Sequence, residues 1–140
     1  MGVRFDPMTI EDYDELLALW QATEGMGLTE SDSRHGTEAF LKRNPGMSFV
    51  AREGGRIVGT IMCGHDGRRG YLTHLAVAKD HRRCGIGKQL VAHCVAALER
   101  EGIIGCNLFI LNSNVEGRRF WESQGWTAPD YWGVMNRRFR

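Results

Sequence analysis

The chain has 140 residues, of which 42% are hydrophobic and 25% charged, and its formal net charge is +1. These values are typical of a globular protein, and we expect residues 1–140 to form a single domain. A net charge so close to zero gives no global reason to expect a nucleic acid or an anionic membrane as partner. No apolar run is long enough to span a bilayer, and the start of the chain is neither a signal peptide nor a myristoylation site, so we expect a cytoplasmic protein.

The first half of the chain predicts two helices and a group of antiparallel strands. Hydrophobic periodicity and turn residues give these elements: a short strand at 3–5, a helix at 10–21 with Thr9 as N-cap, a mobile loop at 23–36, a helix at 37–43, and strands at 47–52 and 56–63. The last two strands flank Gly54-Gly55, which is a strong hairpin signal.

The second half predicts alternating strands and helices. The expected elements are a strand at 71–78, a helix at 89–100, a strand at 106–111, a helix at 115–124 closed by Gly125, and a last strand at 134–139. The order is therefore βααβββαβαβ, an α/β fold with a mixed sheet, antiparallel early and parallel where the long helix crosses over. This order alone does not name a function.

A basic, glycine-containing turn joins the strand at 71–78 to the long helix: Arg82-Arg83-Cys84-Gly85-Ile86-Gly87-Lys88. Such a turn directs several backbone N–H groups into one concavity, and the helix N-terminus adds partial positive charge. Gly85 and Gly87 let the backbone come close to a bound group, while Arg82, Arg83 and Lys88 add charge. The turn predicts a pyrophosphate site; the alternative is a solvated basic turn at the start of an ordinary helix.

Two familiar phosphate-binding loops do not fit this turn. A P-loop requires Ser or Thr after Gly87-Lys88, where this chain has Gln89. The Rossmann fingerprint requires a third glycine, where this chain has Leu90.

The cysteines and histidines predict no metal site. The four cysteines, Cys63, Cys84, Cys94 and Cys106, form no C-x-x-C pair, and the histidines show no zinc-binding spacing. We expect Cys63, Cys94 and Cys106 to be small core residues and Cys84 to be partly exposed in the turn.

Two motifs together resemble one enzyme family. The turn, with Arg82 three residues before Gly85, resembles the acetyl-CoA loop (Q/R-x-x-G-x-G/A) of the GNAT N-acetyltransferase superfamily. The segment 114–126 resembles the family's second motif, N-x-x-A/G-x-x-L/F-Y-x-x-x-G-F/Y, through these residues: Asn114, Gly117, Phe120, Trp121, Gly125 and Trp126. The likeness is to a small, single-domain, bacterial-type member and covers nearly the whole chain, although residues 9–45 match only in element order.

The resemblance implies a V-shaped sheet in which the strands at 71–78 and 106–111 splay apart around the pantetheine arm of acetyl-CoA. The unpaired strand edge would bind the pantetheine amides, the turn would bind the pyrophosphate, and Asn114 would contact the pantetheine or the thioester. The implied cofactor-binding residues are Leu75, Ala76, Val77, Arg82, Arg83, Cys84, Gly85, Ile86, Gly87, Lys88, Asn114 and Trp121.

The implied reaction moves an acetyl group from acetyl-CoA to a primary amine by direct attack in a ternary complex. A backbone N–H of Leu75 or Ala76 would stabilise the oxyanion. Many family members have a tyrosine acid where this chain has Trp121, and an indole cannot act as an acid. A thiol with a pKa of about 8.5 is already a fair leaving group, so this change weakens the mechanism without excluding it. In place of the tyrosine, the departing thiolate could take its proton from Tyr131, Ser123 or a water.

Strand alternation separates the candidate bases. It places Tyr71, Thr73 and Leu75 on one face, and Leu72, His74 and Ala76 on the other. The resemblance places catalytic residues on the Tyr71/Thr73 face, so we expect His74 to be a packed histidine and not the general base. Tyr71 would line the acceptor pocket or order a water, with a core-edge aromatic as its alternative role.

For two further sets of residues, the sequence allows either a role in acceptor binding or a purely structural role. His65-Asp66 either reaches the acceptor or forms an ordinary turn. The acidic residues Glu24, Glu30 and Asp32 either attract a cationic acceptor or belong to a solvated loop.

A second class of function stays open beside the enzyme. Trp121 is compatible with a non-catalytic module that binds or senses acyl-CoA, whereas a nucleotide-binding regulatory domain is disfavoured by the incomplete loop fingerprints. The acceptor, a small molecule or a peptide amine, is not identified by the sequence; a peptide α-amine, a lysine side chain, a polyamine, an amino acid and an antibiotic all remain. The use of acyl groups other than acetyl and the oligomeric state, including a homodimer, are also open.

Overall fold

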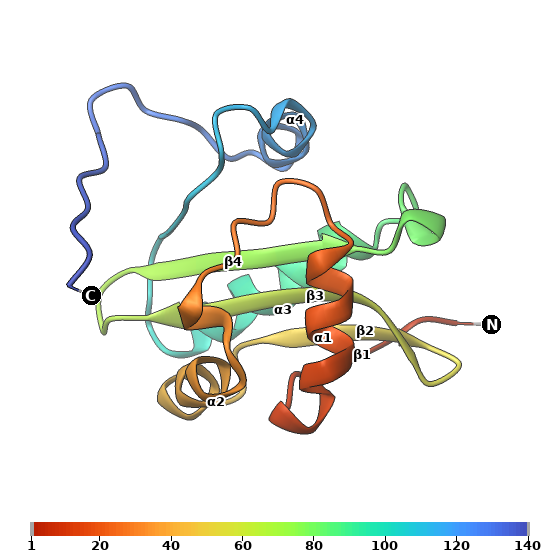
Figure 1. Ribbon diagram of the computed structural model, residues 1–140. Coiled ribbons are helices and arrows are strands. Elements are labelled where there is room, and N and C mark those ends of the chain that lie inside the picture. The colour runs from red at the N-terminus through yellow and green to blue at the C-terminus, as the bar shows by residue number, and fades with distance from the viewer. Residues whose placement is uncertain (1, 140) are drawn as a thin grey trace.

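The computed structural model describes residues 2–139, which contain one five-stranded sheet of order β1-β2-β3-β4-β5 (Figure 1). The strands are β1 (Arg4–Pro7), β2 (Phe49–Glu53), β3 (Arg56–His65), β4 (Gly70–Val77) and β5 (Cys106–Leu108). The α-helices are α1 (Tyr13–Gln21), α2 (Arg34–Arg43), α3 (Ile86–Arg100) and α4 (Val115–Ser123), and the short 3₁₀ helices are η1 (Ile10–Asp12), η2 (Glu30–Asp32) and η3 (Lys79–His81). The first three strand pairings are antiparallel and β4 pairs with β5 in parallel, which confirms the mixed sheet.

The sheet buries an apolar cluster on each face. Helix α3 covers one face with an apolar stripe of buried residues, Ile86, Leu90, Cys94 and Leu98. Helices α1 and α2 cover the other face, where Leu16 and Trp20 are fully buried (Figure 1). The sheet is therefore enclosed on both sides, as expected for a strand order with a parallel crossover.

Several predicted boundaries move once the tertiary structure is considered. Thr9 precedes the 3₁₀ turn η1 and makes no side-chain cap, so α1 begins only at Tyr13. The segment expected to be a loop at 23–36 contains η2 and the start of α2. Helix α3 begins at Ile86, so the second glycine of the basic turn already lies in its first turn.

The strand expected at 134–139 is wrong. The described part of this segment has no regular structure, and Val134, Met135 and Phe139 are 70%, 99% and 90% exposed. An apolar segment becomes a strand only when an edge is available for its backbone groups, and β5 ends at Leu108 instead of the predicted residue 111. The local pattern was strand-like, but the described fold provides it no partner.

A β-bulge interrupts β4 at its centre. Met62 pairs with Thr73 and Thr60 pairs with Ala76, so Ile61 alone faces both His74 and Leu75. His74 takes a left-handed conformation (φ 55°), which is uncommon for a residue with a side chain.

The bulge is held by a buried side chain on β3. The hydroxyl of Thr60 donates to the carbonyl of His74 at 2.8 Å and accepts from the indole N–H of Trp20 at 3.1 Å. Thr60 is fully buried, so these two bonds connect α1, β3 and β4 in a place that water does not reach.

The bulge also reverses strand alternation, so the predicted face of His74 is wrong. Leu72 packs with the α3 cluster, and beyond the bulge Leu75 does so as well. Ala76 belongs to the α1 cluster, and the His74 ring lies edge-on to Trp20 of α1 with centroids 4.7 Å apart. His74 therefore faces the same side as Thr73, because the extra residue shifts the alternation by one. Its side chain is only 12% exposed, so the expectation of a packed histidine is correct in burial.

We predict that Thr60→Val lowers the free energy of unfolding by about 2–6 kcal/mol, because it leaves two buried polar groups without a partner at about 1–3 kcal/mol each. Thr60→Ser keeps the hydroxyl and removes one methyl group, so a loss of about 1 kcal/mol is expected. Urea unfolding of the two variants measures both values. Equal losses would contradict a hydrogen-bonding role for Thr60.

Candidate functional site

Strands β4 and β5 pair only at their beginnings. The paired residues are Gly70 with Cys106, Tyr71 with Asn107 and Leu72 with Leu108. The remainder of β4, from Thr73 to Val77, has no paired residue on β5. The sheet therefore opens in a V from the bulge onward, as the family resemblance implied.

Backbone alternation decides which groups of β4 face this opening. The N–H of Ala78 donates to the carbonyl of Val58 on β3 at 2.8 Å. Groups two residues apart point to the same side of a strand, so the N–H of Ala76 is also directed toward β3. The N–H groups of Leu75 and Val77 are directed the other way, into the opening between β4 and β5. Of the three residues expected to meet the pantetheine, Leu75 and Val77 thus present the available donors.

The basic turn closes the open end of this V. The guanidinium of Arg82 donates from Nε to the carbonyl of Val77 at 3.0 Å, which places it at the end of the exposed strand edge. Arg83 and Gly85 have φ values of 63° and 80°, both left-handed, and α3 begins immediately afterwards. Left-handed residues next to a helix start turn successive N–H groups toward one side, which is the arrangement that binds anions. Arg82, Arg83, Cys84 and Lys88 are all exposed there.

The two glycines of the turn have different roles. Gly85 has the positive φ that favours glycine, and a Cβ there would meet only Gln89 Nε2 at 3.9 Å. Gly87 lies inside α3, and a Cβ there would lie 3.3 Å from the Phe120 ring. Gly87 therefore admits helix α4 close to α3, a packing reason that the sequence analysis missed.

A charged network anchors the start of the turn. His81 of η3 lies 2.9 Å from the Glu53 carboxylate and 2.8 Å from that of Asp80, while Arg56 lies 3.2 Å from Asp80. Glu53 and then Asp80 raise the pKa of His81, and His81 together with Arg56 lowers the pKa of Asp80 to about 2. Since the pKa of His81 is raised on folding, its stabilising effect is present at low pH and is lost as the pH rises through the folded-state pKa.

Asn114 acts as the N-cap of α4. Its carboxamide oxygen accepts from the N–H of Gly117 at 2.9 Å. A Cβ at Gly117 would lie 2.5 Å from Asn114 Nδ2, so the small residue of the second motif is required by the cap itself. A Cβ at Gly25 would lie 3.0 Å from the same nitrogen, which places the loop after α1 against the beginning of α4.

Trp121 lies in an aromatic cluster on α4. Its ring is edge-on to Phe120 at 5.3 Å and to Trp126 at 5.0 Å. Of the substitute donors, Ser123 already donates its hydroxyl to the carbonyl of Phe120 at 2.6 Å. Tyr131 is 76% exposed and packs on Trp132 at 5.5 Å.

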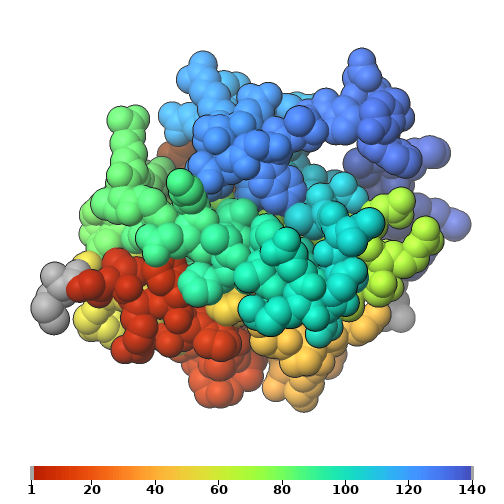
Figure 2. All heavy atoms as spheres, turned by 180° about the vertical axis from the view of Figure 1, so that it is seen from behind, coloured from red at the N-terminus to blue at the C-terminus, as the bar shows by residue number. Residues whose placement is uncertain are grey.

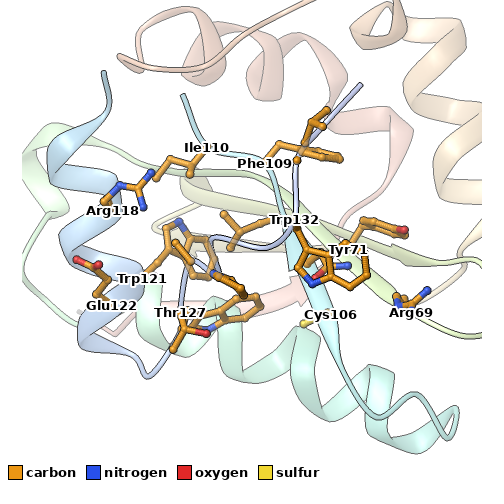
Figure 3. A pocket seen from close by; sticks show the side chains of 17 residues that line it. Arg69, Tyr71, Cys106, Phe109, Ile110, Arg118, Trp121, Glu122, Thr127 and Trp132 are labelled. Atoms are coloured by element: carbon orange, nitrogen blue, oxygen red, sulfur yellow. The ribbon is translucent and has the colours of Figure 1, made fainter. Parts of the chain in front are cut away.

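A pocket of about 420 Å³ lies between β5, α4 and the C-terminal segment (Figure 3). Tyr71, Trp121 and Trp132 give it aromatic walls, and Arg69, Arg118 and Glu122 add charge. Figure 2 shows α4 and the C-terminal segment, both blue, along the edge of the molecule beside the teal α3. The structure thus places Tyr71 both on a pocket wall and one strand repeat from Thr73.

The structure gives each of the remaining candidate residues a partner within the chain. The Asp66 carboxylate accepts from the N–H groups of Arg69 and Arg68 at 2.8 Å, which lowers the pKa of Asp66, and His65 lies 3.2 Å from Glu101. Because the Asp66 carboxylate is used by the backbone of its own turn, the ordinary-turn interpretation is favoured. The three acidic residues each face a cation or a histidine: Glu24 with Lys79 at 3.9 Å, Glu30 with Arg138 at 2.9 Å, and Asp32 with His74 at 2.7 Å. The contact between Asp32 and His74 had no signal in the sequence, because it depends on the bulge.

The cysteines lie as expected, with Cys63 and Cys94 buried, Cys106 half-buried and Cys84 exposed. The neighbouring Cys63 thiol and burial raise the pKa of Cys94, and burial raises the pKa of Cys106 to about 11, so both thiols are neutral and unreactive. Residues 2–139 bring together no cluster of three potential metal ligands. None of the helices in this range is long and apolar enough to cross a membrane.

Comparisons with known proteins identify the family of this chain. The model of the acetyltransferase (GNAT) family matches residues 13–126, and the chain belongs to this family. It is 31% identical over 104 residues to an acetyltransferase of Sodalis glossinidius, covering 74% of this chain and 72% of that protein. It is 33% identical over 102 residues to an acetyltransferase of Photorhabdus laumondii, covering 72% and 68%. The protein is accordingly an acetyltransferase of the GNAT type.

Solved structures share the fold at low sequence identity. PaiA N-acetyltransferase from Thermoplasma acidophilum, in complex with coenzyme A, has a TM-score of 0.81 and 19% identity, covering 93% of this chain and 92% of that one. Ribosomal-protein-alanine N-acetyltransferase from Brucella melitensis biovar Abortus has a TM-score of 0.71 and 23% identity, covering 99% and 100%. At these identities the likeness shows the fold and leaves the acceptor open.

Proposed function

We propose that this protein transfers an acetyl group from acetyl-CoA to a primary amine by direct attack in a ternary complex. The observation that carries the proposal is the continuity of two features. The edge of β4 opened by the bulge leads directly to the basic turn at the start of α3. A strand edge suits the amides of pantetheine and the turn suits a pyrophosphate, so one continuous surface fits one cofactor.

In this proposal each part of the chain has a distinct task. The N–H groups of the turn from Arg83 to Lys88 bind the pyrophosphate, and the edge at Leu75 and Val77 binds the pantetheine arm. The N–H of Leu75, rather than that of Ala76, stabilises the oxyanion, because alternation directs it into the opening. Holding the amine beside the thioester carbonyl then supplies much of the rate.

The packing of Trp121 supports departure of the thiolate without a phenol acid. Its indole belongs to the aromatic cluster with Phe120 and Trp126 and cannot release a proton at accessible pH. A thiol with a pKa of about 8.5 leaves with modest assistance, and a general acid typically adds only about 10²–10⁴-fold. Protonation by water is therefore sufficient for slow turnover.

The aromatic pocket beside Tyr71 is the proposed acceptor site. It adjoins the paired end of β4, while the basic turn lies beyond the other end, so acceptor and cofactor would meet near the bulge. Tyr71 and Trp132 offer aromatic faces that suit an apolar group, and the charged lining consists of one acidic residue, Glu122, and two basic ones, Arg69 and Arg118. The acceptor is proposed only as a primary amine of a small molecule or a peptide. The cytoplasmic location stays a prediction.

We predict that Lys88→Glu weakens acetyl-CoA binding at least about tenfold, since it places a carboxylate beside the pyrophosphate site. Arg100→Glu is the matched control, because Arg100 is an exposed cation in the last turn of the same helix. Calorimetric titration gives the affinities and urea unfolding gives the stabilities. An acid near a helix N-terminus is favourable by about 0.3–1 kcal/mol and unfavourable near the C-terminus. If Lys88→Glu binds acetyl-CoA more weakly but unfolds at no lower urea concentration than the wild type, the loss is due to binding and not to misfolding. Equal affinities of the two variants for acetyl-CoA would contradict the proposed pyrophosphate site.

Turnover of an amine panel tests the activity itself. The panel contains a peptide with a free α-amine, a blocked peptide with one lysine, spermidine, a free amino acid and an aminoglycoside. Each is incubated with acetyl-CoA at pH 8 and the released thiol is measured. We expect turnover of at least one class. Tight binding of acetyl-CoA with no transfer to any amine would instead support the non-catalytic acyl-CoA module that Trp121 leaves open.

A further inference from the structure

The bulge brings three side chains into a line on the acceptor side of β4. His74 Nδ1 lies 2.9 Å from the hydroxyl of Thr73, at an exposed position. His74 Nε2 lies 2.7 Å from a carboxylate oxygen of Asp32, with both side chains 12% exposed. One ring nitrogen thus lies beside the exposed Thr73 hydroxyl and the other beside a largely buried carboxylate.

The buried nitrogen is not satisfied by an ordinary hydrogen bond. Although Asp32 is close, the two groups are not aligned for one, and His74 Nε2 is a buried polar atom without a hydrogen-bond partner among the described residues.

The turn η2 that carries Asp32 also carries a second acidic residue, Glu30. The backbone carbonyl of Asp32 accepts a hydrogen bond from the Tyr13 hydroxyl, which ties η2 to α1. Glu30 of the same turn is neutralised by Arg138 at 2.9 Å, which lowers the pKa of Glu30. Trp20 of α1 and Thr60 of β3 pack against the histidine and carry no charge. Asp32 is accordingly the acidic group that faces the ring.

We propose, resting on the acetyl transfer proposed above, that His74 is the general base and that Asp32 is its positioning residue. A proton of the acceptor ammonium moves to the Thr73 oxygen as the Thr73 hydroxyl proton moves to His74 Nδ1. This leaves a neutral amine and an imidazolium beside the Asp32 carboxylate. The amine nitrogen then forms a bond to the thioester carbonyl carbon, the carbon–sulfur bond breaks, and the proton that the nitrogen loses passes through water to the departing thiolate. The imidazolium returns the first proton to solvent. The location fits, because Thr73 is the first residue of β4 beyond the pairing with β5.

Asp32→Asn is the sharpest variant. Asp32 Oδ2 already accepts the N–H of Thr29 at 2.8 Å as part of a capping box. An asparagine must keep its oxygen on that bond, so its NH₂ group turns toward His74 Nε2. The negative charge beside Nε2 is then replaced by a neutral amide, so an imidazolium no longer has a carboxylate beside it. The substitution thus preserves the cap and removes the charge that would stabilise the protonated base.

We expect His74→Gln and Asp32→Asn each to lower kcat/KM by about 10²-fold at pH 7 and to remove the acidic limb of the pH–rate profile. The probes are acetyl-CoA with a blocked lysine peptide and with a peptide bearing a free α-amine. A lysine amine, with a pKa of about 10.4, needs a base more than an α-amine at about 7.7–8.0. The loss should therefore be larger for lysine where both peptides react; a purely structural role would reduce both equally.

Glu30→Gln is the matched control, because it removes an exposed carboxylate of the same turn and should leave the profile unchanged. An NMR titration of the His74 ring adds a readout that needs no turnover. Its midpoint should move to lower pH in Asp32→Asn, and an unchanged midpoint would overturn the pairing. A folded His74→Gln variant that retains the acidic limb would overturn this inference alone. A wild-type protein without turnover on any amine would overturn the proposed activity, and the role of His74 with it.

Discussion

The bulge in β4 determines which groups of this strand are available for function. One extra residue, opposite Ile61, changes the direction of every later side chain and backbone group. It occurs where pairing with β5 ends, so the opening of the sheet and the reversal of alternation coincide. The cost of a left-handed histidine is offset by the buried bonds from Trp20 to Thr60 and from Thr60 to the His74 carbonyl. A small buried threonine thus supports both the cofactor edge and the position of the candidate base.

The elements around the opening are connected by close packing. Phe120 of α4 rests against Gly87 of α3, and Asn114 lies between its own helix and the loop at Gly25. The charged network of Glu53, Asp80 and His81 anchors the turn from the opposite side. These contacts place the basic turn, the second motif and the loop after α1 around one strand edge. The two family motifs are therefore neighbours because of specific small residues that admit close approach.

Sequence reasoning could predict what depends on local periodicity and on motif chemistry. The stripe on α3, the hairpin at Gly54-Gly55 and the basic turn all have signals that extend over a few residues. It could not predict the bulge, because nothing in the sequence of β4 indicates a left-handed backbone conformation at His74. A strict alternation from Tyr71 onward therefore placed His74 on the wrong face. The last strand failed for a related reason, since strand formation needs a partner edge that local sequence does not describe.

Amide hydrogen exchange tests whether the bulge exposes alternate backbone groups of β4 to the cofactor. Exchange at Leu75, Ala76 and Val77 is measured by NMR in the free protein and with saturating acetyl-CoA. We expect Ala76 to exchange slowly in both states, because its N–H is directed toward β3. Leu75 and Val77 should exchange quickly in the free protein and become protected when acetyl-CoA binds. Unchanged exchange at Leu75 and Val77, or new protection at Ala76 instead, would contradict the register on which the site is built.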